Sequence, residues 1–114
     1  MKTAIVILNW NGKKLLAEFL PSVIKNSAHL ATIYVADNAS TDTSVAFVQA
    51  EFPQVKIIQN ASNGGYAKGY NDALQYLDEE LLILMNSDIK TTSGWLEPMI
   101  KAFETDSNLS AAQP

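Results

Sequence analysis

Ala4-Ile-Val-Ile-Leu8, five consecutive apolar residues, runs into the polar turn Asn9-Trp10-Asn11-Gly12. Such a run, rich in β-branched side chains, is typical of a strand that is covered on both faces in a parallel sheet. Three similar runs follow at 33–36, 55–58 and 81–85, and another begins at 109–112. We therefore expect four strands and the start of a fifth, with the strand at 81–85 also buried on both faces.

Stretches with helical periodicity separate these runs. Apolar residues at 15–24 recur as one buried helix face that Pro21 interrupts, so we expect a kink there or two short helices. Further helices are predicted after the cap-rich segment 37–42, from Gly64 and Gly65 onward with Tyr66 on the apolar face, and around 95–103. This alternation predicts an α/β fold, a mostly parallel sheet with helices on both faces.

Composition limits the size and the partners of the chain. With 114 residues, nearly half of them apolar, it closes one ordinary core and has no room for a second domain of normal size. A net charge of −4, with only eight Lys and Arg, argues against nucleic acid as a partner. The absence of cysteine fits a reducing cytoplasm, and no apolar run reaches the ~20 residues of a transmembrane helix. We expect a cytoplasmic chain without a transmembrane segment.

Polar residues follow the run at 81–85 directly, as Asn86-Ser87-Asp88. In an extended segment residues i and i+2 point the same way, so Asn86 and Asp88 are placed to meet one cation. Oxygen donors favour Mg or Mn, and one carboxylate with one amide needs a diphosphate to complete the site. The alternative is a turn in which Ser87 or Asp88 bonds nearby backbone and no metal is present.

Asp37 and Trp10 also follow predicted strands, at the edge where open α/β sheets bind ligands. Asp37 is placed to accept hydrogen bonds from a ribose hydroxyl or a base N–H; the alternative is that the segment 37–42 only caps a helix, with Asp42 inside its first turn. Trp10 offers a face on which a base can stack, worth ~1–3 kcal/mol, or else is a partly buried core residue.

The glycine-containing segment 63–71 offers a third set of ligand groups. Gly64 and Gly65 allow close backbone approach, the helix start offers free amides, and Lys68 adds a cation, all of which suit phosphate. The alternative is a glycine turn followed by a solvated lysine. His29 has no partner nearby in the sequence for a metal or a proton relay, and we interpret it as a surface residue.

Four motifs in order resemble those of family 2 glycosyltransferases over essentially the whole chain. They are Ile5-Val-Ile-Leu-Asn-Trp-Asn-Gly12, Val35-Ala-Asp-Asn-Ala-Ser-Thr-Asp42, Asn63-Gly-Gly-Tyr66 with Asn71, and Leu82-Ile-Leu-Met-Asn-Ser-Asp88. Their style is closest to the bacterial rhamnosyltransferase-like branch. The resemblance implies a GT-A, Rossmann-like fold in which 1–114 is a single nucleotide-sugar-binding domain, the N-terminal part of an enzyme of polysaccharide biosynthesis.

The resemblance also implies a reaction and its site residues. A sugar would pass, with inversion, from a nucleoside diphosphate (UDP or dTDP) to a hydroxyl of a glycan or lipid-linked acceptor, with Mg or Mn on the diphosphate. Trp10 matches the base-stacking aromatic, Asp37 the acid that contacts base or ribose, and Asp88 the metal-binding end of a D-x-D motif. Asn86 replaces the usual first Asp. The implied nucleotide-binding set is Asn9, Trp10, Asp37, Asn63, Gly64, Lys68 and Asn86, with Asp88 on the metal.

In such enzymes the general base is a carboxylate in a later, acceptor-binding half, for which this sequence has no matching segment. We therefore expect a truncated donor-binding part that is inactive alone, with exposed apolar surface through which it self-associates. Two alternatives stay open. One is an NAD-binding oxidoreductase domain, although the first turn has one glycine where three are needed. The other is a noncatalytic nucleotide-binding module.

Overall fold

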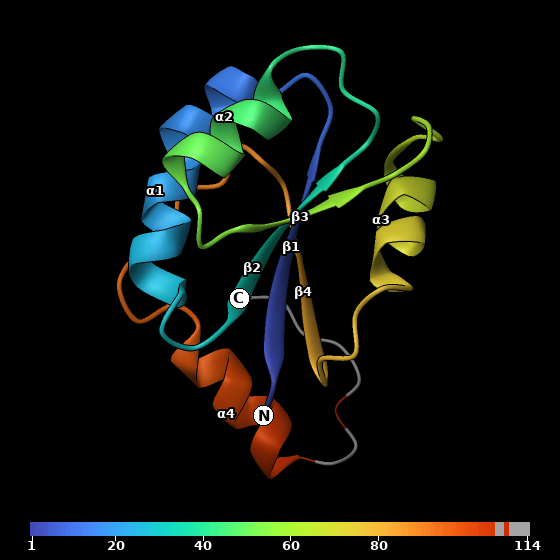
Figure 1. The fold of residues 1–114 in the computed structure, drawn as a ribbon. Coiled ribbons are helices and arrows are strands. Elements are labelled where there is room, and N and C mark those ends of the chain that lie inside the picture. The colour runs from blue at the N-terminus through green and yellow to red at the C-terminus, as the bar shows by residue number, and fades with distance from the viewer. Residues whose placement is uncertain (107–108, 110–114) are drawn as a thin grey trace.

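The computed structural model describes residues 1–106 and 109, and its centre is a parallel sheet of four strands in the order β3-β2-β1-β4 (Figure 1). The strands are β1 (Thr3–Asn9), β2 (Thr32–Asp37), β3 (Lys56–Gln59) and β4 (Leu81–Met85). Every pairing is parallel. The four predicted strands and the α/β class are confirmed. The expected strand start at 109–112 lies outside the described residues, apart from Leu109.

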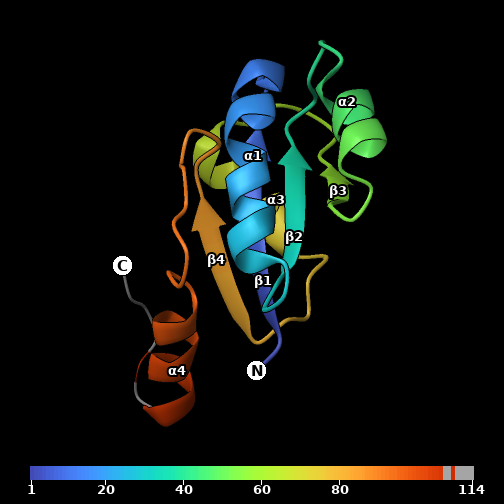
Figure 2. The same cartoon turned by 90° about the vertical axis from the view of Figure 1, so that its left-hand side faces the viewer.

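Within the described residues, three helices connect successive strands and a fourth follows β4. They are α1 (Lys13–Ser27), α2 (Ser44–Glu51), α3 (Tyr66–Leu74) and α4 (Glu97–Thr105). Helices α1 and α2 lie on one face of the sheet and α3 on the other (Figure 1), and α1 lies in front of the strands in Figure 2. Right-handed crossovers require this arrangement. The chain moves outward from β1 to β2 and β3, then returns past β1 to β4. Helix α3, which connects β3 to β4, therefore lies on the opposite face from α1 and α2.

Alternation along β1 gives the sheet two cores. Ile5 and Ile7 belong to the larger core, which α1, α2 and α4 cover, whereas Ala4 and Val6 belong to a smaller core beneath α3. All four side chains are buried. The apolar run at the start of the sequence is therefore continuous because both faces of this central strand are covered.

Strand β4 differs from the expectation that it is buried on both faces. Leu81, Ile83 and Met85 are buried, but Leu82 is 37% exposed and Leu84 is 50% exposed. The reason is that β4 is an edge strand, and the register Ala4↔Leu82 places these two leucines on the face where α3 contacts β1 and β2. Apolar surface is thus exposed, while self-association through it stays a prediction.

Helix α1 is continuous from Lys13 to Ser27 with Pro21 inside it, so the expectation of two short helices is wrong, while the alternative of a kink stays a prediction. Pro21 has no N–H for the carbonyl of Ala17, but both residues are exposed and water can satisfy that carbonyl. Leu20 and Val23, on either side of the proline, are buried against the sheet. Their burial stabilises the helix across the missing bond. Within residues 1–106, no helix has the length and apolar character needed to span a bilayer.

Tyr70 of α3 links the ends of β1 and β4. Its hydroxyl donates to the carbonyl of Met85 at 2.7 Å and accepts from the N–H of Leu8 at 3.4 Å. Burial raises the pKa of Tyr70, so the hydroxyl stays protonated and continues to donate. The side chain thereby satisfies backbone groups at the point where the β1–β4 pairing ends.

The substitution Tyr70→Phe should lower the free energy of unfolding by about 1–3 kcal/mol, because it leaves the Met85 carbonyl without its buried donor. Urea denaturation followed by circular dichroism measures this. Tyr76→Phe is the matched control, since Tyr76 is largely exposed and its change should stay within about 0.5 kcal/mol. Equal, small effects of both substitutions would contradict the bridging role.

Candidate functional site

The polar clusters of the sequence meet at the carboxyl edge of the sheet. Register Asn9↔Asp37 aligns the ends of β1 and β2, and Ile7↔Met85 brings the end of β4 beside β1. The chain steps from β1 to β2 in one direction and reaches β4 in the other, so strand order reverses between β1 and β4. Open α/β sheets bind ligands in the crevice formed at such a reversal.

Asn9 and Asp37 form a buried pair beneath this edge. The amide nitrogen of Asn9 donates to Asp37 Oδ1 at 2.9 Å, and the Asn9 oxygen accepts from the Gly12 N–H at 3.1 Å. Ser40 donates to Asp37 twice, from its hydroxyl at 2.7 Å and its N–H at 2.9 Å. Asp37 is only 3% exposed. Its carboxylate thus stabilises the turn after β2, and direct contact of Asn9 or Asp37 with a nucleotide stays a prediction.

Asn11 and Asp42 join the loops that follow β1 and β2. Asn11 Oδ1 accepts from the N–H groups of Thr41 and Asp42, at 2.8 and 3.1 Å. The sequence predicts Asp42 in the first turn of a helix, but this residue precedes α2 and accepts from Ser44 and from the Lys13 N–H. Burial opposes ionisation of Asp42, yet these hydrogen bonds outweigh it and lower the pKa of the carboxyl. The two loops are therefore held as one unit.

Trp10 projects from this unit and is 56% exposed, so it is not a core residue. It lies directly after β1, at the carboxyl edge of the sheet, and its neighbour Asn9 is buried. The indole therefore has a surface available for stacking with a planar ligand.

The segment after β4 carries Asn86 and Asp88 at the same carboxyl edge of the sheet. Asn86 Oδ1 accepts from the hydroxyl of Tyr66 at 2.8 Å, and Asp88 is exposed. Among the residues that the structure describes, no three His, Cys, Asp or Glu side chains gather closely enough to hold a metal. The donors at this place are one carboxylate and one amide oxygen, a set that Mg or Mn accepts when phosphate oxygens complete it.

Tyr66 is a site neighbour that sequence periodicity missed. The helical pattern places it on the apolar face of α3, but it is 61% exposed and its hydroxyl contacts Asn86. Its ring packs edge-on against Tyr70, with centroids 4.9 Å apart. Its position as the first residue of α3 is the signal that sets it apart, because a helix start lies nearest the strand ends.

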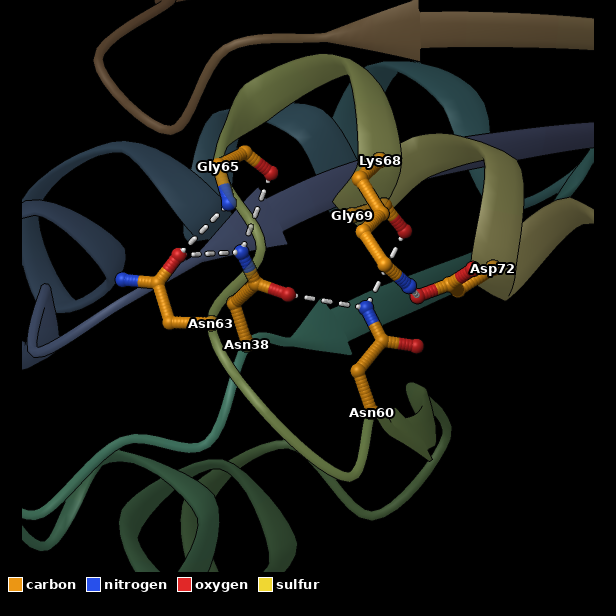
Figure 3. A network of polar contacts seen from close by, with 7 residues as sticks. All are labelled: Asn38, Asn60, Asn63, Gly65, Lys68, Gly69 and Asp72. Atoms are coloured by element: carbon orange, nitrogen blue, oxygen red, sulfur yellow. Dashed lines mark hydrogen bonds and ion pairs between the residues drawn. The ribbon is translucent and has the colours of Figure 1, made fainter.

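Asn63 and Lys68 lie on either side of the start of α3 (Figure 3), and Gly64 precedes the helix by two residues. A Cβ atom on Gly64 would lie 2.3 Å from Lys68 Cδ, so glycine is what allows the lysine stem to cross there. Lys68 Nζ pairs with Asp72 at 2.7 Å on the exposed side of the helix. Asn63 Oδ1 accepts from the Gly65 N–H at 3.0 Å. The loop is thus ordered by its own contacts, with a cation at its outer side.

Solved structures share this fold. A structure of Staphylococcus aureus TarS in complex with UDP-GlcNAc has a TM-score of 0.79 and 22% identity over 99% of this chain and 37% of that one. The mannosyltransferase PcManGT from Pyrobaculum calidifontis, in complex with GDP-Man and Mn²⁺, has a TM-score of 0.71 and 19% identity, over 81% of this chain and 29% of that one. These similarities confirm the Rossmann-like GT-A arrangement.

Similarity in sequence identifies the family as well as the fold. An uncharacterised glycosyltransferase, YfnE of Bacillus subtilis strain 168, is 31% identical over 113 residues, which are 96% of this chain and 29% of that protein. The chain thus spans under a third of this relative's length. The family model described as glycosyl transferase family 2 matches residues 4–113. With nearly every residue inside that match, the chain belongs to glycosyl transferase family 2.

Proposed function

We propose that this chain forms the donor-binding part of a glycosyltransferase that moves a sugar from UDP or dTDP to an acceptor hydroxyl with inversion. The observation that carries the proposal is the shared carboxyl edge of the sheet, where Trp10 follows β1, Asp37 ends β2 and Asp88 follows β4. Membership of family 2 supports the reaction class and sets the NAD-binding alternative aside. The rhamnosyltransferase-like branch, the glycan or lipid-linked acceptor and a cytoplasmic location stay predictions.

In this proposal the nucleotide lies across the end of β1. Trp10 stacks on the base. Asn9 and Ser40 leave one lone pair of the Asp37 carboxylate free, and with it Asp37 accepts a hydrogen bond from a ribose hydroxyl or a base N–H. Asn9 acts through the loop that it holds, because its amide is buried. Asn63, Gly64 and Lys68 belong to the segment that lines the nucleotide pocket beside the end of β2. The complexes of TarS with UDP-GlcNAc and of PcManGT with GDP-Man show that this fold accommodates such donors.

Mg or Mn would bind at Asp88, with the Asn86 oxygen and the diphosphate as further ligands. Bound there, the ion would neutralise charge that develops on the departing diphosphate. Asn86 keeps a second lone pair after accepting from Tyr66, so its oxygen is still able to serve as a ligand. The Mn²⁺ in the PcManGT complex supports a divalent cation in this fold.

Asp88→Ala should remove most of the Mn-dependent part of UDP binding. Removing a residue that only hydrogen-bonds to a metal ligand costs roughly 10- to 100-fold in metal affinity, and removing the ligand itself should cost at least as much. Isothermal titration with UDP, in the presence and absence of Mn, measures it. Asp78→Ala, an exposed aspartate just before the amino end of β4, is the control and should leave binding unchanged. Mn-independent UDP binding by the unmodified chain would argue against this metal site.

Trp10→Ala should weaken UDP binding by ~1–3 kcal/mol, or about 5- to 150-fold, through loss of stacking. Trp10→Phe keeps an aromatic face and should recover most of the affinity. The same titration measures both variants. An unchanged affinity in Trp10→Ala would place the base elsewhere.

Transfer itself requires a base that deprotonates the acceptor hydroxyl. We propose that this base lies in the part of the longer relatives that is outside the region matched by this chain. UDP binding without transfer, when the chain is part of a protein as long as those relatives, would instead favour a noncatalytic nucleotide-binding module.

A further inference from the structure

Three asparagine amides form a chain beneath the loop that leads into α3 (Figure 3). The Asn60 nitrogen donates to the Asn38 oxygen at 3.0 Å, and the Asn38 nitrogen donates to the Asn63 oxygen at 2.9 Å. Asn38 directly follows β2 and Asn60 directly follows β3, and both are buried, whereas Asn63 is exposed. The chain of amides therefore connects two strand ends to one side chain at the surface.

Backbone groups fix which end of each amide points in which direction. The Asn60 nitrogen also donates to the Gly69 carbonyl at 3.0 Å, and the Asn38 nitrogen to the Gly65 carbonyl at 3.3 Å. The Gly65 N–H donates to the Asn63 oxygen at 3.0 Å. A carbonyl only accepts and an N–H only donates, so no amide in the chain can turn over without losing hydrogen bonds.

The consequence at the surface concerns Asn63. Its oxygen already accepts two hydrogen bonds, from Asn38 and Gly65, while its nitrogen has no partner among residues 1–106 and 109. The loop thus presents N–H donors rather than an acceptor. They lie beside the end of β2, on the opposite side of β1 from the segment that carries Asp88.

We propose that Asn38 is a positioning residue that holds Asn63 as a hydrogen-bond donor to a base carbonyl. The inference rests on the proposed function, in which the diphosphate lies near Asp88 and the nucleoside extends across β1 toward β2. Uracil and thymine carry a carbonyl at position 4, whereas cytosine carries an amino group whose N–H would face the N–H groups of Asn63. Two opposed donors leave each other unsatisfied. The amide chain therefore selects uridine or thymidine nucleotides over cytidine nucleotides.

Titration of the chain with UDP and with CDP, both with Mn, tests this selection. The unmodified chain should prefer UDP by about tenfold, the cost of one unsatisfied polar pair. Asn63→Asp is isosteric and only accepts, so it should erase or reverse that preference. Asn38→Asp keeps the acceptor for Asn60 but withdraws the donor that orients Asn63. Its preference should fall toward unity, although residue 38 does not contact the base.

The ratio of the two affinities separates orientation from charge and stability. Both ligands carry the same diphosphate, so an added carboxylate weakens both alike. Ser62→Asp places the same charge in the same exposed loop, and Val48→Ala destabilises the core on the other face of the sheet. Both controls should keep the ratio of the unmodified chain.

Each outcome of these titrations decides a different claim. Equal binding of UDP and CDP by the unmodified chain overturns the inference alone, and so does an unchanged ratio in both Asn63→Asp and Asn38→Asp. A changed ratio in Asn63→Asp but not in Asn38→Asp overturns the positioning role of Asn38. Binding of neither nucleotide overturns the proposed function together with the inference.

Discussion

The reversal of strand order at β1 is the constraint from which the rest of the molecule follows. Right-handed crossovers place α1 and α2 on one face while the chain moves outward through β2 and β3, and α3 on the other when it returns to β4. The start of α3 then lies at the carboxyl edge, where Tyr66 reaches Asn86 and Tyr70 bridges the ends of β1 and β4. The right-handedness of the crossovers thus brings the loops after β1 and β4 and the loop before α3 to the same edge of the sheet.

Beneath that edge, buried polar side chains hold exposed ones in place. Asn9 and Asp37 are buried and bonded to each other; exposed Trp10 follows the first and buried Asn38 follows the second. Hydrogen bonds are strong in such a low-dielectric setting, and a nearly satisfied network makes the loops rigid. A weakly structured loop would have to be ordered by its ligand, at a cost in conformational entropy. Here the contacts within the chain order the loops.

Periodicity alone was enough to predict the strands, the order of elements and the edge at which the polar clusters gather. It failed where the outcome depends on neighbours in space. The run 81–85 is as apolar as β1, yet Leu82 and Leu84 are exposed because β4 is at the sheet edge. Pro21 does not divide α1, because burial of the apolar residues beside it stabilises the helix across the missing hydrogen bond. Within the asparagine-rich clusters, only the folded loops determine which amides point inward.

Asn86 shows how local chemistry and the proposed function are coupled. An aspartate at this position would bring a second negative charge close to Asp88, and an amide avoids that repulsion while still accepting from Tyr66. The proposed metal position then carries one carboxylate among the described residues, too little charge to hold a divalent cation tightly without phosphate oxygens. In the proposed function, therefore, metal and nucleotide complete each other's site, and each should raise the affinity of the chain for the other by the same factor.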